Sequence, residues 1–221
     1  MPKTFELIVF DWDGTLMDSA ARIVASLRAA GQDIGFADHS DAGFRNVIGL
    51  GMQEAIRVLY PTISDADVWQ YADRYRHHFL ESCPMPEQLF EGVPEILASL
   101  HQQPVMLAVA TGKSRKGLDR VLRHTDCGRY FQATRCADET TSKPHPQMLL
   151  ELIEELGAKP ETTLMVGDTE YDMEMAQRAG TAALAVTYGA HESHRLDKYQ
   201  PLASLNNIHA LGQWFENNLK L

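Results

Sequence analysis

The sequence has few cysteines and no long apolar run. Three of its 221 residues are cysteine, and none of them stands in a Cys-x-x-Cys pair. This excludes a disulfide framework and a zinc site built on cysteine pairs. No stretch approaches the roughly 18 consecutive apolar residues of a membrane span, and the first apolar run, at 7–10, is too short for a signal peptide. We therefore expect a reduced, cytoplasmic protein with no membrane partner.

Basic residues are also scarce. Twenty lysines and arginines stand against 30 acidic residues, which leaves a formal net charge of −10. A surface with this excess repels nucleic acid as well as anionic lipid, so we expect no nucleic-acid partner. Hydrophobic residues make up 44% of the chain and charged residues 23%, the proportions of an ordinary globular protein rather than a disordered one. The length allows one large domain or two small ones.

The chain alternates short apolar runs with helical patterns. Four runs, each followed by polar residues or glycine, predict buried strands at 7–10, 105–110, 163–166 and 183–186. Apolar residues recur at helical spacing between and after them, at 94–101, 114–124, 146–157 and 173–179. Strands that alternate with helices of this length predict an α/β fold with a doubly wound parallel sheet.

Residues 19–82 interrupt this alternation. Three amphipathic helical patterns with no buried strand among them lie there, at 20–30, 52–60 and 65–80. We therefore expect a separate helical domain over 19–82. It would be inserted into a discontinuous sheet domain made of 1–18 and 83–221, with the proline-rich segment 83–86 as the return linker.

Residues able to do chemistry follow the predicted strands or lie in a proline-flanked loop. Because the carboxyl ends of parallel strands meet at one edge of an open sheet, we expect these side chains to converge there. Neighbouring carboxylates repel by about 4 kcal/mol per pair at an effective dielectric near 20, so the cluster requires a cation. Oxygen ligands with open water positions favour Mg²⁺. The set consists of Asp11, Asp13, Thr111, Lys143, Asp168 and Asp172.

Four motifs contain these residues, in the order FDWDGTLMDS, TGK, SKPHP and GDTEYDMEMA. A single aspartate at a strand end is more often a helix cap or a turn residue, but the joint pattern favours a site. With these motifs the sequence resembles phosphohydrolases of the haloacid dehalogenase superfamily, in the subgroup with a helical (C1) cap inserted just after the first motif. The resemblance covers essentially the whole chain. The first motif, the SKPHP loop and the segment 47–51 are similar to phosphoglycolate phosphatases.

The resemblance implies a two-step phosphoryl transfer. Asp11 would be the nucleophile that forms an aspartyl phosphate, and Asp13 the general acid and base. The transferring phosphoryl group would be bound by Thr111, Gly112 and Lys143.

The resemblance also implies a magnesium site. Mg²⁺ would be held by a carboxylate oxygen of Asp11, the backbone carbonyl of Asp13 and the carboxylate of Asp168. Asp172 would act through a water molecule or by positioning Lys143.

Three further cations, Arg45, Lys113 and Arg115, are candidates for contacts that set substrate specificity. Arg45 precedes a Gly49-Leu50-Gly51 turn in the helical insertion and is the best candidate there to face a substrate. Of Arg22, Arg28 and Arg57 in the same insertion, we expect most to be solvated. Lys113 and Arg115 directly follow the TGK threonine and would bind a second anionic group of the substrate or face solvent at a helix start.

We therefore expect a Mg²⁺-dependent phosphatase, a monomer or homodimer, that hydrolyses a small phosphorylated metabolite similar to phosphoglycolate. A phosphosugar mutase or an inorganic pyrophosphatase of the same superfamily remains an alternative, because a mutase would share the core residues. Dehalogenase chemistry is disfavoured by the carboxylate of Asp13. A non-catalytic module that binds a phosphorylated ligand is the alternative outside enzymes, and the intact Asp11 and Asp13 argue against it.

Overall fold

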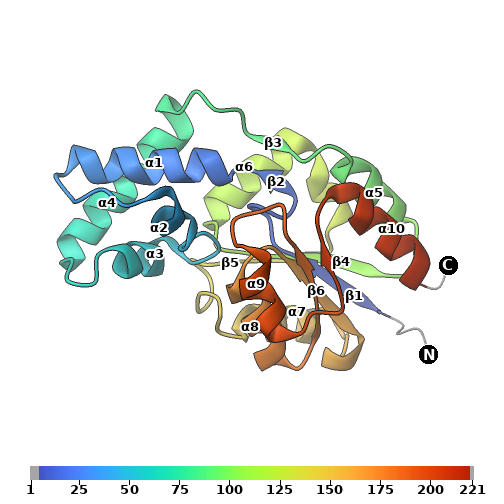
Figure 1. The fold of residues 1–221 in the computed structure, drawn as a ribbon. Helices are drawn as coiled ribbons and strands as arrows, with labels where there is room; N and C mark the ends of the chain where they lie inside the picture. Colours follow the sequence, from blue (N-terminus) through green and yellow to red (C-terminus); the bar gives the residue numbers. More distant parts are fainter. Residues whose placement is uncertain (1–4, 220–221) are drawn as a thin grey trace.

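The computed structural model describes residues 5–219, which form a sheet domain and a helical cap (Figure 1). The sheet is entirely parallel and has the order β5-β4-β1-β6-β7-β8. The predicted doubly wound parallel fold is confirmed. Its strands are β1 (Leu7–Phe10), β4 (Met106–Thr111), β5 (Ala133–Cys136), β6 (Thr163–Gly167), β7 (Ala182–Val186) and β8 (Ser204–Leu205).

Helices cover both faces of this sheet (Figure 1). Side chains of β1 alternate between two apolar clusters: Ile8 and Phe10 pack with α5, α6 and α10, whereas Leu7 and Val9 pack with α7 and α8. This two-sided burial explains the uninterrupted apolar run of the strand. The helices are α5 (Val93–His101), α6 (Arg115–Thr125), α7 (Gln147–Leu156), α8 (Glu170–Ala179), α9 (Ser193–Leu196) and α10 (Ile208–Asn218), with short 3₁₀ turns at Cys127–Tyr130, Pro160–Thr162 and Asp197–Tyr199.

Several predictions for this domain differ from the structure, and helices α9 and α10 were not predicted. Helix α8 begins at Glu170 rather than at 173, because Thr169 and Asp172 form a reciprocal capping box at its start. The edge strands β5 and β8 were not predicted. Strand β5 pairs with a neighbour on one side only and contains the half-buried Thr134 and Arg135, so it lacks the continuous apolar run of a central strand.

The cap consists of α1 (Ala20–Asp33), α2 (Asp41–Arg45), α3 (Met52–Leu59), α4 (Asp65–His77) and a π-helical turn at His78–Ser82. The predicted helix at 65–80 is therefore divided at His77, and the short α2 was not predicted. The cap helices surround their own apolar cluster, to which the sheet domain contributes Ala190 as a buried member. The chain enters and leaves the cap through the antiparallel pair β2 (Met17–Asp18) and β3 (Gln88–Leu89). The division at 18/19 and 82/83 stays our proposal.

In the part of the chain that the structure describes, no helix combines the length and the apolar character that a bilayer span requires.

Candidate active site

The carboxylate of Asp11 lies at the carboxyl end of the central strand β1 and is fully buried. Its Oδ1 atom lies 2.8 Å from the Nζ of Lys143, and its Oδ2 has no hydrogen-bond partner among residues 5–219. Burial raises the pKa of Asp11 to about 7, because the nearby Lys143 offsets the loss of solvation only in part. A buried carboxylate oxygen without a partner is costly, so this atom is poised to bind an electrophile or a cation.

The ammonium group of Lys143 lies between two carboxylates. It is fully buried and donates to Asp172 Oδ1 at 2.7 Å in addition to its contact with Asp11. Burial alone would lower the pKa of Lys143, but the two carboxylates outweigh burial and raise the pKa above its ordinary value. Asp172 in turn accepts hydrogen bonds at Oδ2 from the backbone and the side chain of Thr169, at 3.0 and 2.7 Å. Asp172 therefore holds Lys143 in place.

Asp168 completes a group of three buried carboxylates. Asp11, Asp168 and Asp172 each present one oxygen within 4.8 Å of the others. Thr15 donates to Asp168 Oδ1 at 2.9 Å, and the backbone N–H of Ala190 donates to Oδ2 at 2.7 Å. Burial and the two neighbouring carboxylates raise the pKa of Asp168 well above its ordinary value. Oxygen ligands in this arrangement are suited to a hard divalent cation.

The carboxylate of Asp13 does not belong to this group, which corrects the expectation that all four aspartates surround one point. Its Oδ1 accepts a hydrogen bond from Ser19 Oγ at 2.6 Å, and its Oδ2 lies 3.0 Å from Lys113 Nζ. The two aspartates of the first motif therefore have different surroundings. Gly14, between them and Thr15, has φ +84°, and a Cβ there would lie 2.2 Å from Asp168 Oδ2, so a glycine is required.

Thr111 is the last residue of β4, and Gly112 and Lys113 continue from it into a loop directly under the cap. The Thr111 hydroxyl is buried and accepts a hydrogen bond from the Lys113 backbone at 3.2 Å. A Cβ on Gly112 would lie 2.5 Å from the carbonyl oxygen of Leu50, so the cap turn rests directly on this loop. The Nζ of Lys113 also lies 5.0 Å from the ring centre of Phe79, in the π-helical turn of the cap.

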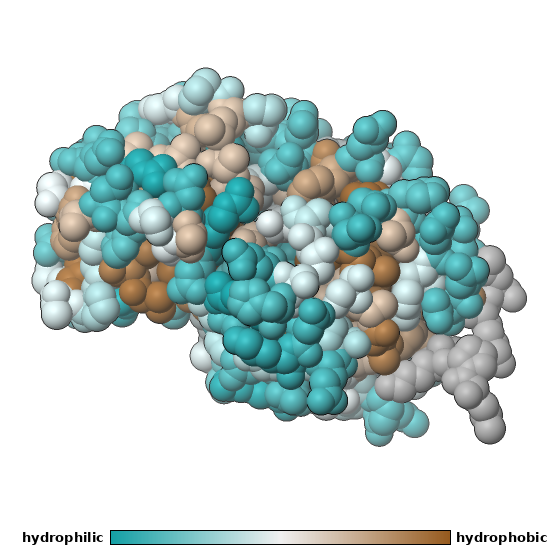
Figure 2. All heavy atoms as spheres, in the orientation of Figure 1, coloured by the Kyte–Doolittle hydropathy of each residue, from teal (hydrophilic) through white to brown (hydrophobic). Residues whose placement is uncertain are grey.

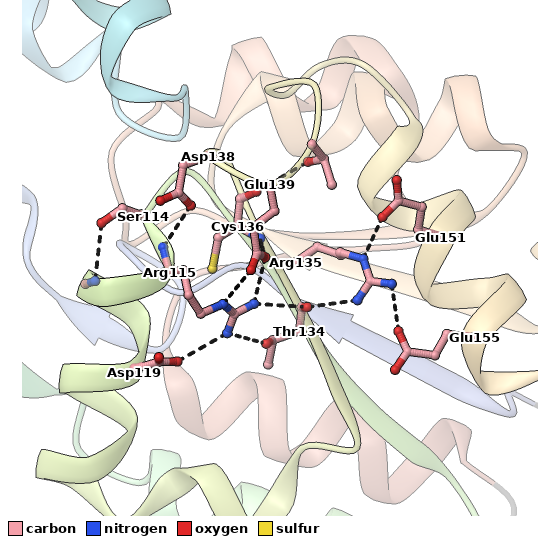
Figure 3. A network of polar contacts seen from close by, with 12 residues as sticks. Ser114, Arg115, Asp119, Thr134, Arg135, Cys136, Asp138, Glu139, Glu151 and Glu155 are labelled. Atoms are coloured by element: carbon pink, nitrogen blue, oxygen red, sulfur yellow. Dashed lines mark hydrogen bonds and ion pairs between the residues drawn. The ribbon is translucent and has the colours of Figure 1, made fainter.

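An arginine joins this loop to the segment that leads to Lys143 (Figure 3). Arg115, at the start of α6, donates to both carboxylate oxygens of Glu139 at 2.8 Å and to Thr134 Oγ1 at 2.8 Å. Its backbone N–H donates to Asp138 Oδ1 at 2.8 Å. The guanidinium of Arg115 is therefore occupied within the protein, and the structure shows it neither free for a second anion of the substrate nor simply solvated, the two alternatives that the sequence left open.

The arginines of the cap have different surroundings. Arg45 is half-buried at the end of α2, and its guanidinium has no hydrogen bond or ion pair with any residue between 5 and 219. Arg22 is buried rather than solvated, which corrects the expectation: its guanidinium donates to the backbone carbonyls of Phe79 and Met85. Carbonyls in a π-helical turn and an irregular linker lack regular partners, and Arg22 supplies them.

Several contacts of the site were missed by sequence reasoning. Ser19 ends the first motif, and its place in FDWDGTLMDS was the available signal. Thr15 belongs to the same motif, but its hydrogen-bond partner Asp168 is 153 residues away. Ser142 was assigned no role, yet its Oγ accepts from the backbone N–H of Gly51 in the cap at 2.7 Å.

Comparison with known proteins identifies the family of this chain. A model of the haloacid dehalogenase-like hydrolase family matches residues 8–186. The chain belongs to this family. A protein of Dickeya dadantii named "Probable phosphatase IndB" is 37% identical over 201 residues, which cover 88% of this chain and 86% of that protein. A phosphoglycolate phosphatase of Aquifex aeolicus is 30% identical over 184 residues, covering 83% of this chain and 85% of its own.

A solved structure shows the same fold. A hydrolase from Pseudomonas syringae superimposes with a TM-score of 0.88 at 19% identity, covering 97% of this chain and 100% of that one. The resemblance inferred from the motifs is confirmed, and the protein is an enzyme of the phosphatase class in the haloacid dehalogenase-like family.

Proposed function

We propose that the protein is a Mg²⁺-dependent phosphatase that hydrolyses a small anionic phosphomonoester through an aspartyl phosphate on Asp11. The observation that carries this proposal is the state of Asp11: it is fully buried, it lies beside Lys143, and one of its oxygens has no partner among residues 5–219. A structural carboxylate in that position would have its oxygens satisfied.

The residues fit a magnesium ion. Burial is the main cause of the raised pKa values of Asp11 and Asp168, and three buried carboxylates against one ammonium group add an excess of negative charge to it. The ligands would be the carboxylates of Asp11 and Asp168 and the backbone carbonyl of Asp13. When bound, Mg²⁺ neutralises the carboxylates and withdraws charge from the phosphoryl oxygens.

The protein residues then have separate tasks. Asp11 attacks phosphorus, so that the P–O bond to the leaving group breaks and a carboxyl–phosphate bond forms. Asp13, held by Ser19, gives its proton to the leaving alkoxide and later removes a proton from the water molecule that hydrolyses the intermediate. Lys143, together with Thr111 and Gly112, binds the phosphoryl oxygens.

We propose that a second anionic group of the substrate binds beside the leaving oxygen. Lys113 supplies a cation there, because it already contacts Asp13, which would protonate that oxygen. Arg45, with no ionic partner in the described part of the chain, is a second candidate. A small carboxylate-bearing ester such as phosphoglycolate has this chemistry, and the 30% identity to a phosphoglycolate phosphatase supports it.

The test is phosphate release from p-nitrophenyl phosphate with Mg²⁺ and with EDTA. It is followed by a panel containing phosphoglycolate, a sugar phosphate and pyrophosphate. We expect Mg²⁺-dependent release, with phosphoglycolate or a similar small acid ester preferred. Preference for pyrophosphate, or interconversion of sugar phosphates, would replace the proposal by the corresponding alternative, and tight binding without release would indicate a binding module. Cytoplasmic location and the monomeric or homodimeric state stay predictions.

A further inference from the structure

We propose that the loop after β7, residues 187–192, couples docking of the cap to the position of the Asp168 carboxylate, and that Asn46 is the cap residue through which it does so. The inference rests on the proposed function, because Asp168 is there a ligand of Mg²⁺. It assigns a positioning role to residues that touch neither substrate nor metal.

Three side chains of the sheet domain converge on Asn46. The backbone oxygen of Asn46 accepts a hydrogen bond from the hydroxyl of Tyr171 at 2.8 Å and lies 3.3 Å from Nε2 of His191. Its side-chain Oδ1 accepts from Arg195 at 2.8 Å. These donors come from α8, from the loop after β7 and from α9, so one residue of the cap connects three elements of the sheet domain.

The contact with His191 has a defined direction. Nδ1 of His191 accepts a hydrogen bond from the backbone N–H of Glu170 at 3.1 Å, so the ring proton is on Nε2 and points to Asn46. The imidazole is almost fully buried and lies against the ring of Tyr171, with 5.3 Å between the ring centres. The loop is therefore held firmly against the cap on this side.

The same loop contacts Asp168 on its other side. The backbone N–H of Ala190 donates to Asp168 Oδ2 at 2.7 Å, and a Cβ on Gly189 would lie 2.2 Å from that oxygen. The side chain of Ala190 meanwhile belongs to the apolar cluster of the cap. The consecutive residues 189–191 thus contact the Asp168 carboxylate on one side and the cap on the other.

Hydrogen bonds of this kind contribute to docking of the cap, beside the bond between Gly51 and Ser142 and the close fit of Leu50 on Gly112. The cap has an apolar cluster of its own, and the seam between the cap and α9 is lined by hydrophilic residues on the face that Figure 2 shows. The net contribution of one hydrogen bond changes an equilibrium constant by roughly fivefold. Removing two of them should therefore measurably shift the equilibrium from the docked to the undocked cap. If docking positions Asp168, Mg²⁺ must bind the docked state more tightly and favour docking by the same factor.

The experiment compares two double variants. Tyr171→Phe/Arg195→Gln removes two of the donors to Asn46. The matched control Tyr199→Phe/Arg178→Gln makes the same chemical changes around Glu174 of α8, to which Tyr199 donates and with which Arg178 forms an ion pair. The readouts are the Kd for Mg²⁺ from calorimetry and the amide hydrogen exchange of 46–51, with exchange in β1 and β6 as the measure of an intact fold.

In the wild type, Mg²⁺ should slow exchange over 46–51. In the Asn46-directed variant, exchange there should rise by about tenfold and the Kd for Mg²⁺ by roughly three- to tenfold, with β1 and β6 unchanged. Tyr171→Phe alone should give a smaller change in the same direction, and the control should resemble the wild type.

Faster exchange with an unchanged Kd would overturn the coupling, and unchanged exchange would overturn the role of Asn46. Equal changes in the control would show general loosening and would also overturn the proposal. Neither readout requires a substrate. Turnover without coupling would therefore reject this inference alone, whereas coupling without turnover would reject the proposed hydrolysis alone.

Discussion

At the scale of single residues, Asp11 is both fully buried and the nucleophile that we propose. The asparagine amide has nearly the same shape as the carboxylate but is a poor nucleophile, so Asp11→Asn should reduce kcat to less than about a hundredth of the wild-type value. Because the substitution removes a buried charge from a crowded site, the fold should remain intact. Measurements of kcat on p-nitrophenyl phosphate and circular dichroism check both expectations.

Asp126→Asn is a matched control for this substitution. Asp126 is an exposed residue with φ +55°, a conformation that asparagine tolerates, and it pairs with Arg129, outside the four motifs. Its variant should keep the wild-type rate. Turnover by Asp11→Asn above about a hundredth of the wild-type rate would show that Asp11 is not the nucleophile.

At the scale of elements, the loop after β4 and the cap turn fit together at Gly112. A methyl group there would lie 2.5 Å from the carbonyl oxygen of Leu50, so Gly112→Ala must displace backbone. We expect kcat/KM to fall by about tenfold or more, because the loop that we propose binds the phosphoryl group could no longer fit against the cap. Gly117→Ala in α6 is the control: its methyl would lie 3.3 Å from the hydroxyl of Ser114, and alanine favours a helix. Equal kcat/KM for Gly112→Ala and Gly117→Ala would contradict a close fit between the loop after β4 and the cap turn.

The contact between Arg115 and Glu139 should make the stability of the protein depend on pH. Arg115 lowers the pKa of Glu139 below its ordinary value of 4.5, so the folded state favours the ionised carboxylate. The contribution of Glu139 to stability is therefore present above pH 4.5 and is lost as the pH falls through the lowered pKa. Glu139→Gln should reduce the urea midpoint near neutral pH, and the difference from the wild type should shrink on acidification.

Glu161→Gln changes an exposed carboxylate that has no ion pair in the described part of the chain, and it serves as the control for Glu139. Its urea midpoint should follow that of the wild type at each pH. A difference between Glu139→Gln and the wild type that stays constant down to about pH 2 would show that packing, and not charge, is responsible.

At the scale of the whole molecule, the buried carboxylates oppose folding unless a cation neutralises them. Mg²⁺ should therefore stabilise the native state by about 2.7 kcal/mol at a concentration one hundred times its Kd, which raises Tm by roughly 5 to 10 °C for a chain of this size. Calorimetry with Mg²⁺ and with EDTA measures the shift. Asp168→Asn should lose most of it. An equal shift in that variant would place the cation elsewhere.

The amino-acid sequence was enough to predict the central strands, the family and the residues that follow each of these strands. A strand buried on both faces must be apolar along its whole length, as in Leu7–Phe10. The residues that follow it in the sequence lie at its carboxyl end, because they are joined to it by peptide bonds. Edge strands escape this rule, and β5 was missed because one of its sides has no neighbour.

Contacts between groups that are distant in the sequence could be read only from the packed structure. Packing of the cap and the loops determines three such contacts: the ion pair of Asp13 with Lys113, the ion pair of Glu139 with Arg115, and the burial of Arg22 under the linker. The same holds for Asn46, whose partners lie 125 to 149 residues further along the chain. A charged side chain pairs with the group that the folded backbone brings within about 3 Å of it. The neighbouring residues in the sequence do not reveal which group that is.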